Sequence, residues 1–468
     1  MDELVALLQI IDHSLLDRFS GNSKLLVEGI LSGKYRKRED IDLFSGKNKA
    51  ILISQLFSKV RSKLVSFVIV TSADWLPERH LEVKEDAWKK FAYTQVMIGK
   101  GKRRLVVKFQ KQLLKLAVDY GFADLAVLVA KDLMYASGLG KDRKSFLMYE
   151  KVMNESSDLL RLEQKILSIY LALEGAMRKQ DFDRVELDKD FISSLDANKL
   201  SSSTSFTLFM FIKVWFEMRN LNYHEAIDLC SLALGRLRNL KGSRRGQVFA
   251  FYLRRSLGKL ALMDFGSAYQ DILEGESLFS EFSYNVVVVR VYKLVNLIHA
   301  ERYQDAFDEY SGFDNKGYLD EWFKLIGAYL SFIEDKGIRV AKFVNEVPEF
   351  SKDRTGFNLI VIGVQLLHLI RKGNFDRVID RLESLGSMKR KYLNSEASRR
   401  SKIFVKMLLE LIPGNFNRIN VERRTSDLFN KLVNQKMEIP PSLEIEIVRF
   451  DQIWNEILKL LGDHTNKM

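Results

Sequence analysis

Apolar residues recur along most of the chain at three- and four-residue spacing, and the strict alternation that marks a half-buried strand is scarce. Helix formers such as Leu, Lys, Glu and Ala fill the long segments between turn signals. Four consecutive valines at 286–289 look strand-like in isolation. Because Val291, Leu294 and Ile298 continue them at helical spacing, they are predicted to belong to a buried helix. The pattern as a whole predicts an all-α protein.

A seven-residue turn sequence recurs along the chain, as KGNFDRV at 372–378, KQDFDRV at 179–185 and PGNFNRI at 413–419. Each copy separates two apolar runs of helical period, which predicts the tight turn of a helical hairpin with its aromatic residue packed between the helices. The equivalent turn positions are Phe122, Phe182, Tyr223, Phe265, Tyr303, Ile338, Phe375 and Phe416. After a first gap of 60 residues the steps are 41, 42, 38, 35, 37 and 41, as in two-helix repeats.

A small or aliphatic residue follows most of these turn positions by three. The residues are Val185, Ala226, Ala268, Ala306, Ala341, Val378 and Ile419. We interpret this position as the point where the second helix of a hairpin approaches the first, since a small side chain permits close contact there.

The copy at 223–233 carries a turn aromatic, then Ala226, Cys230 and Ala233 at fixed offsets. With these residues, the chain resembles the tetratricopeptide-repeat (TPR) family over about residues 100–435. The resemblance implies an α-solenoid of about seven TPR-like antiparallel helix hairpins. The spacing exceeds the usual 34 residues, and the Trp-Leu-Gly signature of the first helix is missing.

Three parts follow from this interpretation: a basic N-terminal helical module (1–95), the TPR-like α-solenoid (96–440) and a C-terminal capping helix (441–468). The last helix is predicted at 443–461, after an N-cap at Ser442. Its apolar stripe consists of Ile447, Phe450, Trp454, Ile457 and Leu461. We expect it to cover the exposed end of the core, as a terminal repeat must.

The N-terminal module is predicted to contain helices at 4–19, 23–32, 39–44 and 49–70. A short helix, a turn at Gly46 and a longer basic helix give the outline of a helix-turn-helix. Asp42 stands where such motifs usually place a small apolar residue. A solvated basic face on a capping module is the alternative interpretation.

Charge is distributed unevenly along the 468 residues, whose net charge is +12. Residues 1–115 hold 22 Lys and Arg against 13 Asp and Glu, so most of the surplus lies there. This makes an acidic partner, protein or nucleic acid, a hypothesis for the N-terminal module. The nucleic-acid candidates are Lys47, Lys49, Lys59, Arg61 and Lys63.

Catalytic constellations are not evident in the sequence. The six histidines lie far apart, no paired Cys/His spacing occurs, and the glycine-rich stretches at 99–104 and 137–141 lack the spacing of a phosphate-binding loop. We therefore predict no enzyme activity, no metal and no cofactor.

The single cysteine, Cys230, excludes a disulfide within the chain and indicates a reducing compartment. The acidic N-terminus lacks the basic region of a secretory signal. The longest apolar runs, at 206–212 and 359–370, are shorter than the roughly 20 residues that cross a bilayer. A cytoplasmic protein without a membrane span is expected.

In the TPR family the first helices of the hairpins line a concave side. The family register implies that Trp215, Arg219, His299 and Arg371 lie there, a mixture that suits a protein or peptide partner. Burial between helices is the alternative for several of them. The first hypothesis is a non-catalytic scaffold or adaptor; the second is a regulator with a nucleic-acid-binding N-terminal module and a TPR-like sensor domain. The sequence does not indicate the oligomeric state.

Overall fold

The structure is a computed structural model, and it describes residues 4–5, 8, 19–71, 79–179, 189–241, 244–279, 284–312, 319–335, 357–387, 399–437 and 446–465. These residues form helices and contain no strand, which confirms the all-α prediction for this part of the chain. The chain divides into two compact units, Met1–Leu160 and Arg161–Met468. The division falls within the long helix α7 (Arg143–Lys179), whereas the sequence led us to expect a boundary at residue 95.

The first unit begins with α2 (Asn22–Leu31) and α3 (Lys49–Thr71), in agreement with the helices predicted at 23–32 and 49–70. Most of the helix predicted at 4–19 lies outside the described residues. Buried side chains of α2 and α3, among them Leu26 and Val60, share a core with Tyr35 and Ile41 from the segment between the two helices.

The short helix predicted at 39–44 is wrong. Only a 3-10 turn, η2 (Arg38–Asp40), forms there, and an irregular segment follows it. The Asp40 carboxylate accepts hydrogen bonds from the backbone N–H groups of Arg36 (2.9 Å) and Lys37 (2.7 Å). Because this carboxylate bonds nearby backbone, it favours a local turn over a helix. The predicted helix-turn-helix outline therefore loses its first helix.

The rest of the first unit is a helical bundle built from α4 (Arg79–Gly99), α5 (Arg103–Asp119), α6 (Ala123–Leu139) and the start of α7. The hairpin predicted at 105–120 and 123–135 is confirmed. Gly121 takes a left-handed φ of 69° at the turn, which glycine adopts at little cost. The buried Phe122 precedes α6 and contributes to the core of this bundle.

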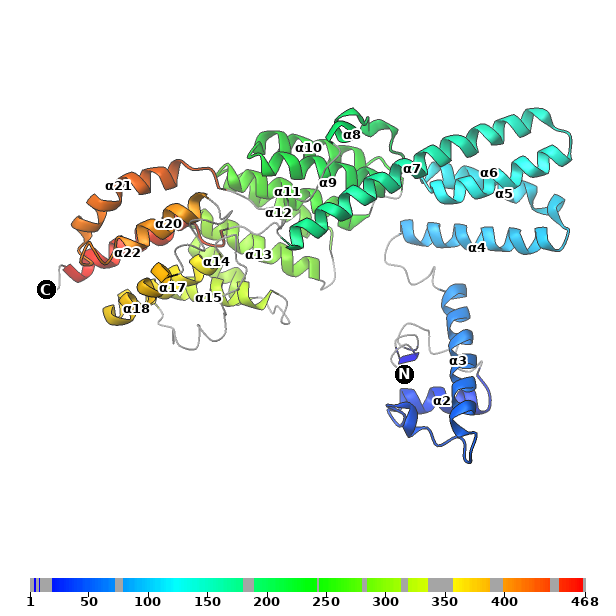
Figure 1. Ribbon diagram of the computed structural model, residues 1–468, viewed down its shortest axis with the longest axis horizontal. Coiled ribbons are helices and arrows are strands. Elements are labelled where there is room, and N and C mark those ends of the chain that lie inside the picture. The colour runs from blue at the N-terminus through cyan, green and yellow to red at the C-terminus, as the bar shows by residue number, and fades with distance from the viewer. Residues whose placement is uncertain are drawn as a thin grey trace. The chain divides into compact units, whose positions relative to one another are not determined.

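The second unit continues from α7 as a succession of helices (Figure 1). They are α8 (Lys189–Ser194), α9 (Ser203–Arg219), α10 (Tyr223–Leu237), α11 (Arg245–Ala261), α12 (Phe265–Glu276), α13 (Tyr284–His299), α14 (Tyr303–Ser311), α15 (Asp320–Ile333), α17 (Phe357–Arg371), α18 (Phe375–Ser387), α20 (Arg399–Leu409), α21 (Arg418–Asn434) and α22 (Phe450–Thr465). From α9 onward each described helix contacts the next one along the chain. The predicted helix across the four valines is confirmed as α13.

The turn aromatics stand at the starts of second helices, as predicted. Tyr223, Phe265, Tyr303 and Phe375 are the first residues of α10, α12, α14 and α18. Phe416 lies in the turn before α21. The turn positions Phe182 and Ile338 lie outside the described residues.

These four hairpin turns share one backbone geometry. The residue two positions before each aromatic has a left-handed φ: Leu221 (61°), Met263 (61°), Glu301 (59°) and Gly373 (67°). The next amide donates to the carbonyl five residues earlier, as Asn222 does to Glu217 at 2.9 Å. This is the Schellman arrangement that ends a helix. The repeat seen in the sequence is therefore a repeat of turn geometry.

The small residue three positions after the turn aromatic is buried in most described copies. Ala226, Ala268, Ala306 and Val378 are all buried in the main core of the second unit. The last copy differs, since Ile419 is 73% exposed. Val185 and Ala341 lie outside the described residues.

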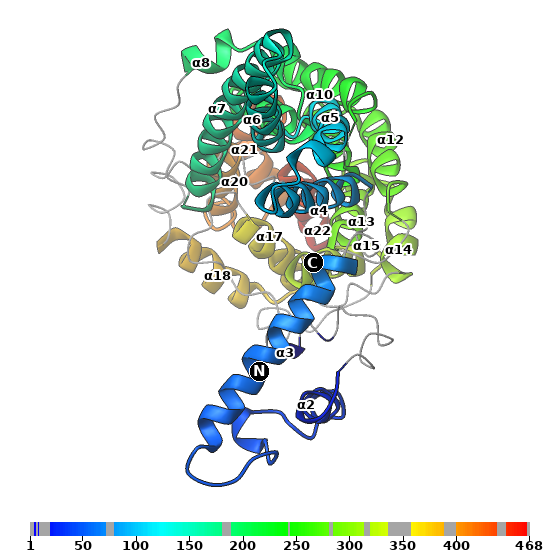
Figure 2. The same cartoon turned by 90° about the vertical axis from the view of Figure 1, so that its right-hand side faces the viewer.

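The C-terminal helix α22 begins at Phe450, whereas the sequence predicted a start at residue 443. Residues 438–445 lie outside the described part of the chain. Its predicted apolar stripe, together with Ile447 before it, is buried. Its contacts are with α17, α20 and α21 (Figure 2). Every residue of α17 except Arg371 is buried, so the helix predicted to close the end of the core also covers the side of α17.

Candidate interaction surface

The helix before each turn aromatic is the first helix of its hairpin. One side of these first helices can be identified by counting back a fixed number of residues from the turn aromatic. Gly363, twelve residues before Phe375, faces α22: a Cβ added there would lie 3.0 Å from Ile453 Cγ2. Phe211 holds the same offset before Tyr223, and Tyr170 holds it before Phe182. We call the side of α7, α9, α11, α13, α17 and α20 at this register the inner face, with a near half on α7, α9 and α11 and a far half on α17 and α20, where Phe404 holds the same offset before Phe416.

The far half of the inner face is occupied by the chain's own C-terminal segment. Gln452 Nε2 donates to the carbonyl of Ile298 at 2.9 Å, at the end of α13. Further back, Tyr223 Oη donates to the carbonyl of Met437 at 2.6 Å, in a buried bond between residues 214 positions apart. These contacts attach the C-terminal segment to the turn ends of earlier hairpins.

A buried ionic cluster fixes the same segment to α20. Arg400 is 1% exposed, and its Nε donates to Glu446 Oε1 at 2.7 Å while Nη2 donates to Asp451 Oδ1 at 2.9 Å. Its Nη1 donates to the carbonyl of Leu432 at 2.6 Å. Although burial opposes the charge, Glu446 and Asp451 raise the pKa of the Arg400 guanidinium above its usual value. Removing one member would leave buried charge without a partner.

His299, predicted to contact a partner, is 1% exposed and lies against this segment. Its Nε2 is 2.6 Å from the carbonyl oxygen of Glu446. Burial, followed by the positive charge of Arg449, lowers the pKa of His299 to about 3, so the imidazole is neutral near pH 7. In this structure His299 therefore contacts the protein's own C-terminal segment.

Arg371, also predicted as a partner contact, is half-buried and bonded within the chain. Its Nη1 donates to the carbonyl of Phe332 at 2.6 Å and lies 3.1 Å from Asp335 Oδ1. The guanidinium stacks on the Phe332 ring, 3.6 Å from its centroid. These bonds join the ends of α15 and α17.

The structure brings Trp215 and Arg219 together on α9. Trp215 is 8% exposed, and the exposed Arg219 lies 5.4 Å from the centroid of its ring. The four residues predicted to form one surface are therefore divided: Trp215 and Arg219 adjoin the near half, whereas His299 and Arg371 are held in contacts within the chain. Their role in partner binding stays a prediction.

The near half carries apolar residues exposed to solvent, which the sequence analysis did not single out. On α7, Leu167 is 44% exposed and Leu171 is 57% exposed. Tyr170 lies between them, with its ring centroid 6.4 Å from that of the half-buried Phe211 on α9. The twelve-residue offset from the turn aromatic is the signal that finds Tyr170 and Phe211.

Arg254 of α11 lies against the Phe211 ring, 4.0 Å from its centroid. Its guanidinium donates to the carbonyl of Ala250 at 3.1 Å and has no ion pair among the described residues. Burial lowers the pKa of Arg254. The neighbouring Arg255 is different, because its Nε donates to the carboxylate of Asp271 at 2.9 Å.

The nucleic-acid candidates of the first unit lie on and before α3. Lys47, Lys59 and Arg61 are exposed, and Lys49 is half-buried. Lys63 is half-buried and lies over the Phe19 ring, 4.7 Å from its centroid. The position that a helix-turn-helix would keep apolar, Asp42, is instead exposed and paired with Lys34 at 2.9 Å.

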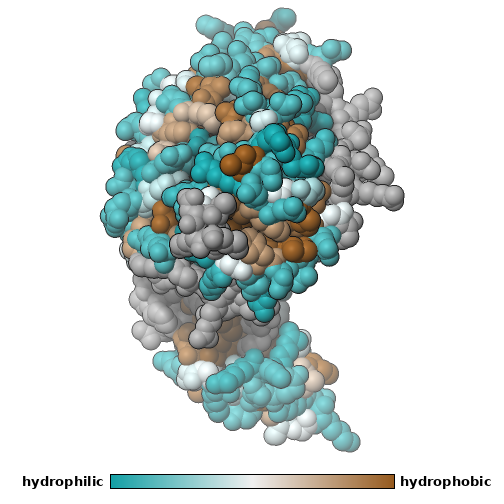
Figure 3. All heavy atoms as spheres, turned by 90° about the vertical axis from the view of Figure 1, so that its left-hand side faces the viewer, coloured by the Kyte–Doolittle hydropathy of each residue, from teal (hydrophilic) through white to brown (hydrophobic). Residues whose placement is uncertain are grey.

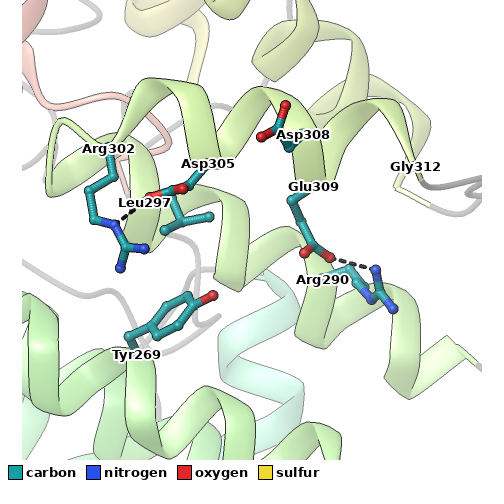
Figure 4. Close-up of a pocket in the computed structure, with 8 residues that line it drawn as sticks. All are labelled: Tyr269, Arg290, Leu297, Arg302, Asp305, Asp308, Glu309 and Gly312. Carbon is teal, nitrogen blue, oxygen red and sulfur yellow. Dashed lines mark hydrogen bonds and ion pairs between the residues drawn. The ribbon is translucent and has the colours of Figure 1, made fainter.

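An open hollow of about 390 Å³ lies between α12, α13 and α14 (Figure 4). Its lining residues are Tyr269, Arg290, Leu297, Arg302, Asp305, Asp308, Glu309 and Gly312. The charges in it pair with each other: Arg302 Nε donates to Asp305 at 2.7 Å, and Arg290 pairs with Glu309. We interpret this hollow as an ion-paired surface between helices.

Within the described residues, no group of three or more His, Cys, Asp or Glu side chains is arranged to hold a metal ion. Of the helices described, none has the length and apolar character needed to cross a membrane. Among the residues coloured in Figure 3, hydrophilic ones cover most of the face shown, and hydrophobic ones form separate patches between them. Comparison of the chain with family models, curated proteins and solved structures finds no match.

Proposed function

We propose that this protein is a non-catalytic scaffold or adaptor whose TPR-like α-solenoid binds a protein segment through the near half of the inner face. The observation that carries the proposal is the exposure of Leu167 and Leu171 beside the half-buried Phe211 and Arg254. An exposed apolar patch rimmed by polar groups is typical of an interaction site. Trp215 and Arg219 would extend the contact along α9.

The repeated hairpins support the solenoid part of the proposal. Consecutive helices pack on each other, and four turns share one left-handed geometry. Stacked repeats of this kind form extended surfaces suited to peptides and helices. We also propose a cytoplasmic location, because the single cysteine, Cys230, cannot form a disulfide within the chain.

Affinity capture with matched variants tests the proposal. The wild-type protein, Leu171→Glu and Ile419→Glu serve as baits in extracts of the source cells. Leu171 and Ile419 are both exposed leucine-sized residues, but Ile419 is the second residue of α21, which is not part of the inner face. The proposal expects a protein that binds the wild type and Ile419→Glu and is lost with Leu171→Glu. Equal recovery with all three baits would contradict it.

The alternative function, nucleic-acid binding by the first unit, is favoured by one observation: Lys47, Lys59 and Arg61 are exposed in a charge-rich part of the chain. Contacts to phosphates release counterions, so such binding weakens steeply with salt. Titration of duplex DNA at several salt concentrations, with wild type and with Lys47→Glu, Lys49→Glu and Arg61→Glu combined, tests this function. Salt-dependent binding that the triple variant lacks would support it, and binding unchanged by the triple variant would remove it.

A further inference from the structure

The near half of the inner face offers two kinds of contact at once. Leu167 and Leu171 are one turn apart on α7 and share a side of that helix with Tyr170 and Glu174. Arg254 lies beside them on α11, within the electrostatic reach of Tyr170 and Glu174. A segment bound here would cover the leucines and meet the arginine.

The charges around this patch lie on different helices. Arg254 and, further along α9, Arg219 contribute positive charge, whereas Glu163 and Glu174 are carboxylates on this side of α7. The Glu174 carboxylate already accepts a hydrogen bond from Tyr170 Oη at 2.7 Å. Because the Arg254 guanidinium donates only to its own helix among the described residues, most of its donors remain available for a carboxylate.

The far half shows which kind of segment packs on the inner face. There α22 presents apolar residues at three- and four-residue spacing, including Trp454, Ile457 and Leu461. Its first turn also carries Asp451, whose carboxylate accepts a hydrogen bond from Arg400 at 2.9 Å. In the far half, therefore, an amphipathic helix of the same chain lies on the inner face, and its carboxylate is bonded to an arginine.

We propose that the near half takes an amphipathic helix of a partner protein, with apolar residues on Leu167 and Leu171 and an Asp or Glu carboxylate paired with Arg254. This inference rests on the proposed function and specifies the chemistry of the partner. Helices that bind in this mode present anchors at spacings of three, four and seven residues. A basic residue at this position of the helix is disfavoured by the same reasoning, since its charge would face Arg254.

Selection from a displayed library of random 16-residue peptides against the full-length protein tests the inference. Selected peptides are then synthesised, and their Kd values are measured with wild type, Leu171→Glu, Arg254→Gln and Arg302→Gln. Arg302 is a suitable control because it is exposed, pairs with Asp305 at 2.7 Å and lies outside the inner face. A circular dichroism spectrum and an unfolding curve show whether each variant folds.

The inference expects selected peptides with apolar residues at helical spacing and at least one Asp or Glu. Their Kd should rise about 10- to 100-fold with Arg254→Gln, as for the loss of one member of a desolvated charge pair, and stay unchanged with Arg302→Gln. Replacing the peptide acid with its amide should weaken binding to the wild type and have little further effect with Arg254→Gln.

Two results would overturn this inference, and only the second of them would also overturn the proposed function. Peptides that lose affinity with Leu171→Glu but carry no acid and ignore Arg254→Gln would reject this inference and leave the proposed function standing. If no peptide is selected, or if binding is insensitive to Leu171→Glu, the near half is not a binding surface and both proposals fail.

Discussion

The two halves of the inner face are built from helices in the same register but have different environments. At the offset of twelve residues from the turn aromatic, Gly363 lies under Ile453 of α22, whereas Phe211 is half-buried and lies beside Tyr170, whose neighbours on α7 are exposed leucines. In the far half, Arg400 is saturated by Glu446 and Asp451, whereas Arg254 in the near half has no ion pair among the described residues. The same side of these helices is thus covered where the chain's own C-terminal segment lies on it and exposed where it does not.

Substitution of Arg400 should have the largest effect on the stability of the far half of the inner face. Arg400→Met leaves Glu446 buried without an ion pair among the described residues and leaves Asp451 with only Arg449, at 3.5 Å, which should lower the free energy of unfolding by about 3–5 kcal/mol. Arg424→Met is the matched control, since Arg424 pairs with Glu410 at 2.7 Å on the exposed surface and should matter by less than about 1 kcal/mol. Chemical denaturation of both variants measures the difference, and equal effects would contradict the assigned role of the cluster.

Low pH should destabilise the far half of the inner face through protonation of His299. The folded pKa is about 3, below the ordinary value of about 6.5, so below pH 6.5 the unfolded chain binds a proton that the folded chain does not. The contribution of neutral His299 to the free energy of unfolding is complete above pH 6.5. It falls as the pH drops toward 3, by at most about 1.4 kcal/mol per pH unit. Unfolding of His299→Gln should depend less steeply on pH between 6 and 4. The same change at the exposed His224 should leave the wild-type slope, and a wild-type slope in His299→Gln would refute the assignment.

Gly363 tests the contact between α17 and α22. A β-branched side chain there would meet Ile453 at about the closest distance that real contacts reach, so Gly363→Val should cost about 1–3 kcal/mol in unfolding free energy. Gly266→Val is the control, because a Cβ added at Gly266 meets nothing within 4 Å. Thermal or chemical unfolding of the pair gives the comparison. An undisturbed Gly363→Val variant would show that α22 does not pack on this side of α17.

A smaller effect is expected where the C-terminal segment passes the α10 turn. Tyr223→Phe removes the hydroxyl that donates to the carbonyl of Met437 and keeps the ring, so it should cost about 1 kcal/mol. Tyr93→Phe, at an exposed tyrosine of the first unit, should change the free energy of unfolding by less than that. Denaturant titration of the two variants provides the measurement, and a Tyr223→Phe protein as stable as wild type would argue against the buried bond.

The helices and hairpin turns were predictable because their signals are local. A left-handed residue at Leu221 or Gly373, followed by an aromatic and a small residue, repeats in the sequence wherever the turn repeats in space. The helix predicted at 39–44 does not form for a local reason as well, since the Asp40 carboxylate bonds nearby backbone instead of supporting a helix.

The closure of the far half was not predictable from the sequence. It depends on contacts between residues far apart in the chain, such as His299 with Glu446, and these leave no periodic signal. For the same reason the family register placed His299 and Arg371 on an open surface. Register alone finds which side of a helix a residue occupies, but it does not show whether another segment covers that side.

Thiol labelling tests the contrast between the two halves most directly, because Cys230, the only natural cysteine, is buried and provides an unreactive background. Leu171→Cys places a thiol on the near half and Ile453→Cys places one beneath α22. In native buffer the account predicts rapid modification at position 171 and protection at position 453, with both thiols reacting equally fast in denaturant. Equal native rates, or a faster rate at position 453, would contradict the claim that the chain closes one half of its inner face and leaves the other open.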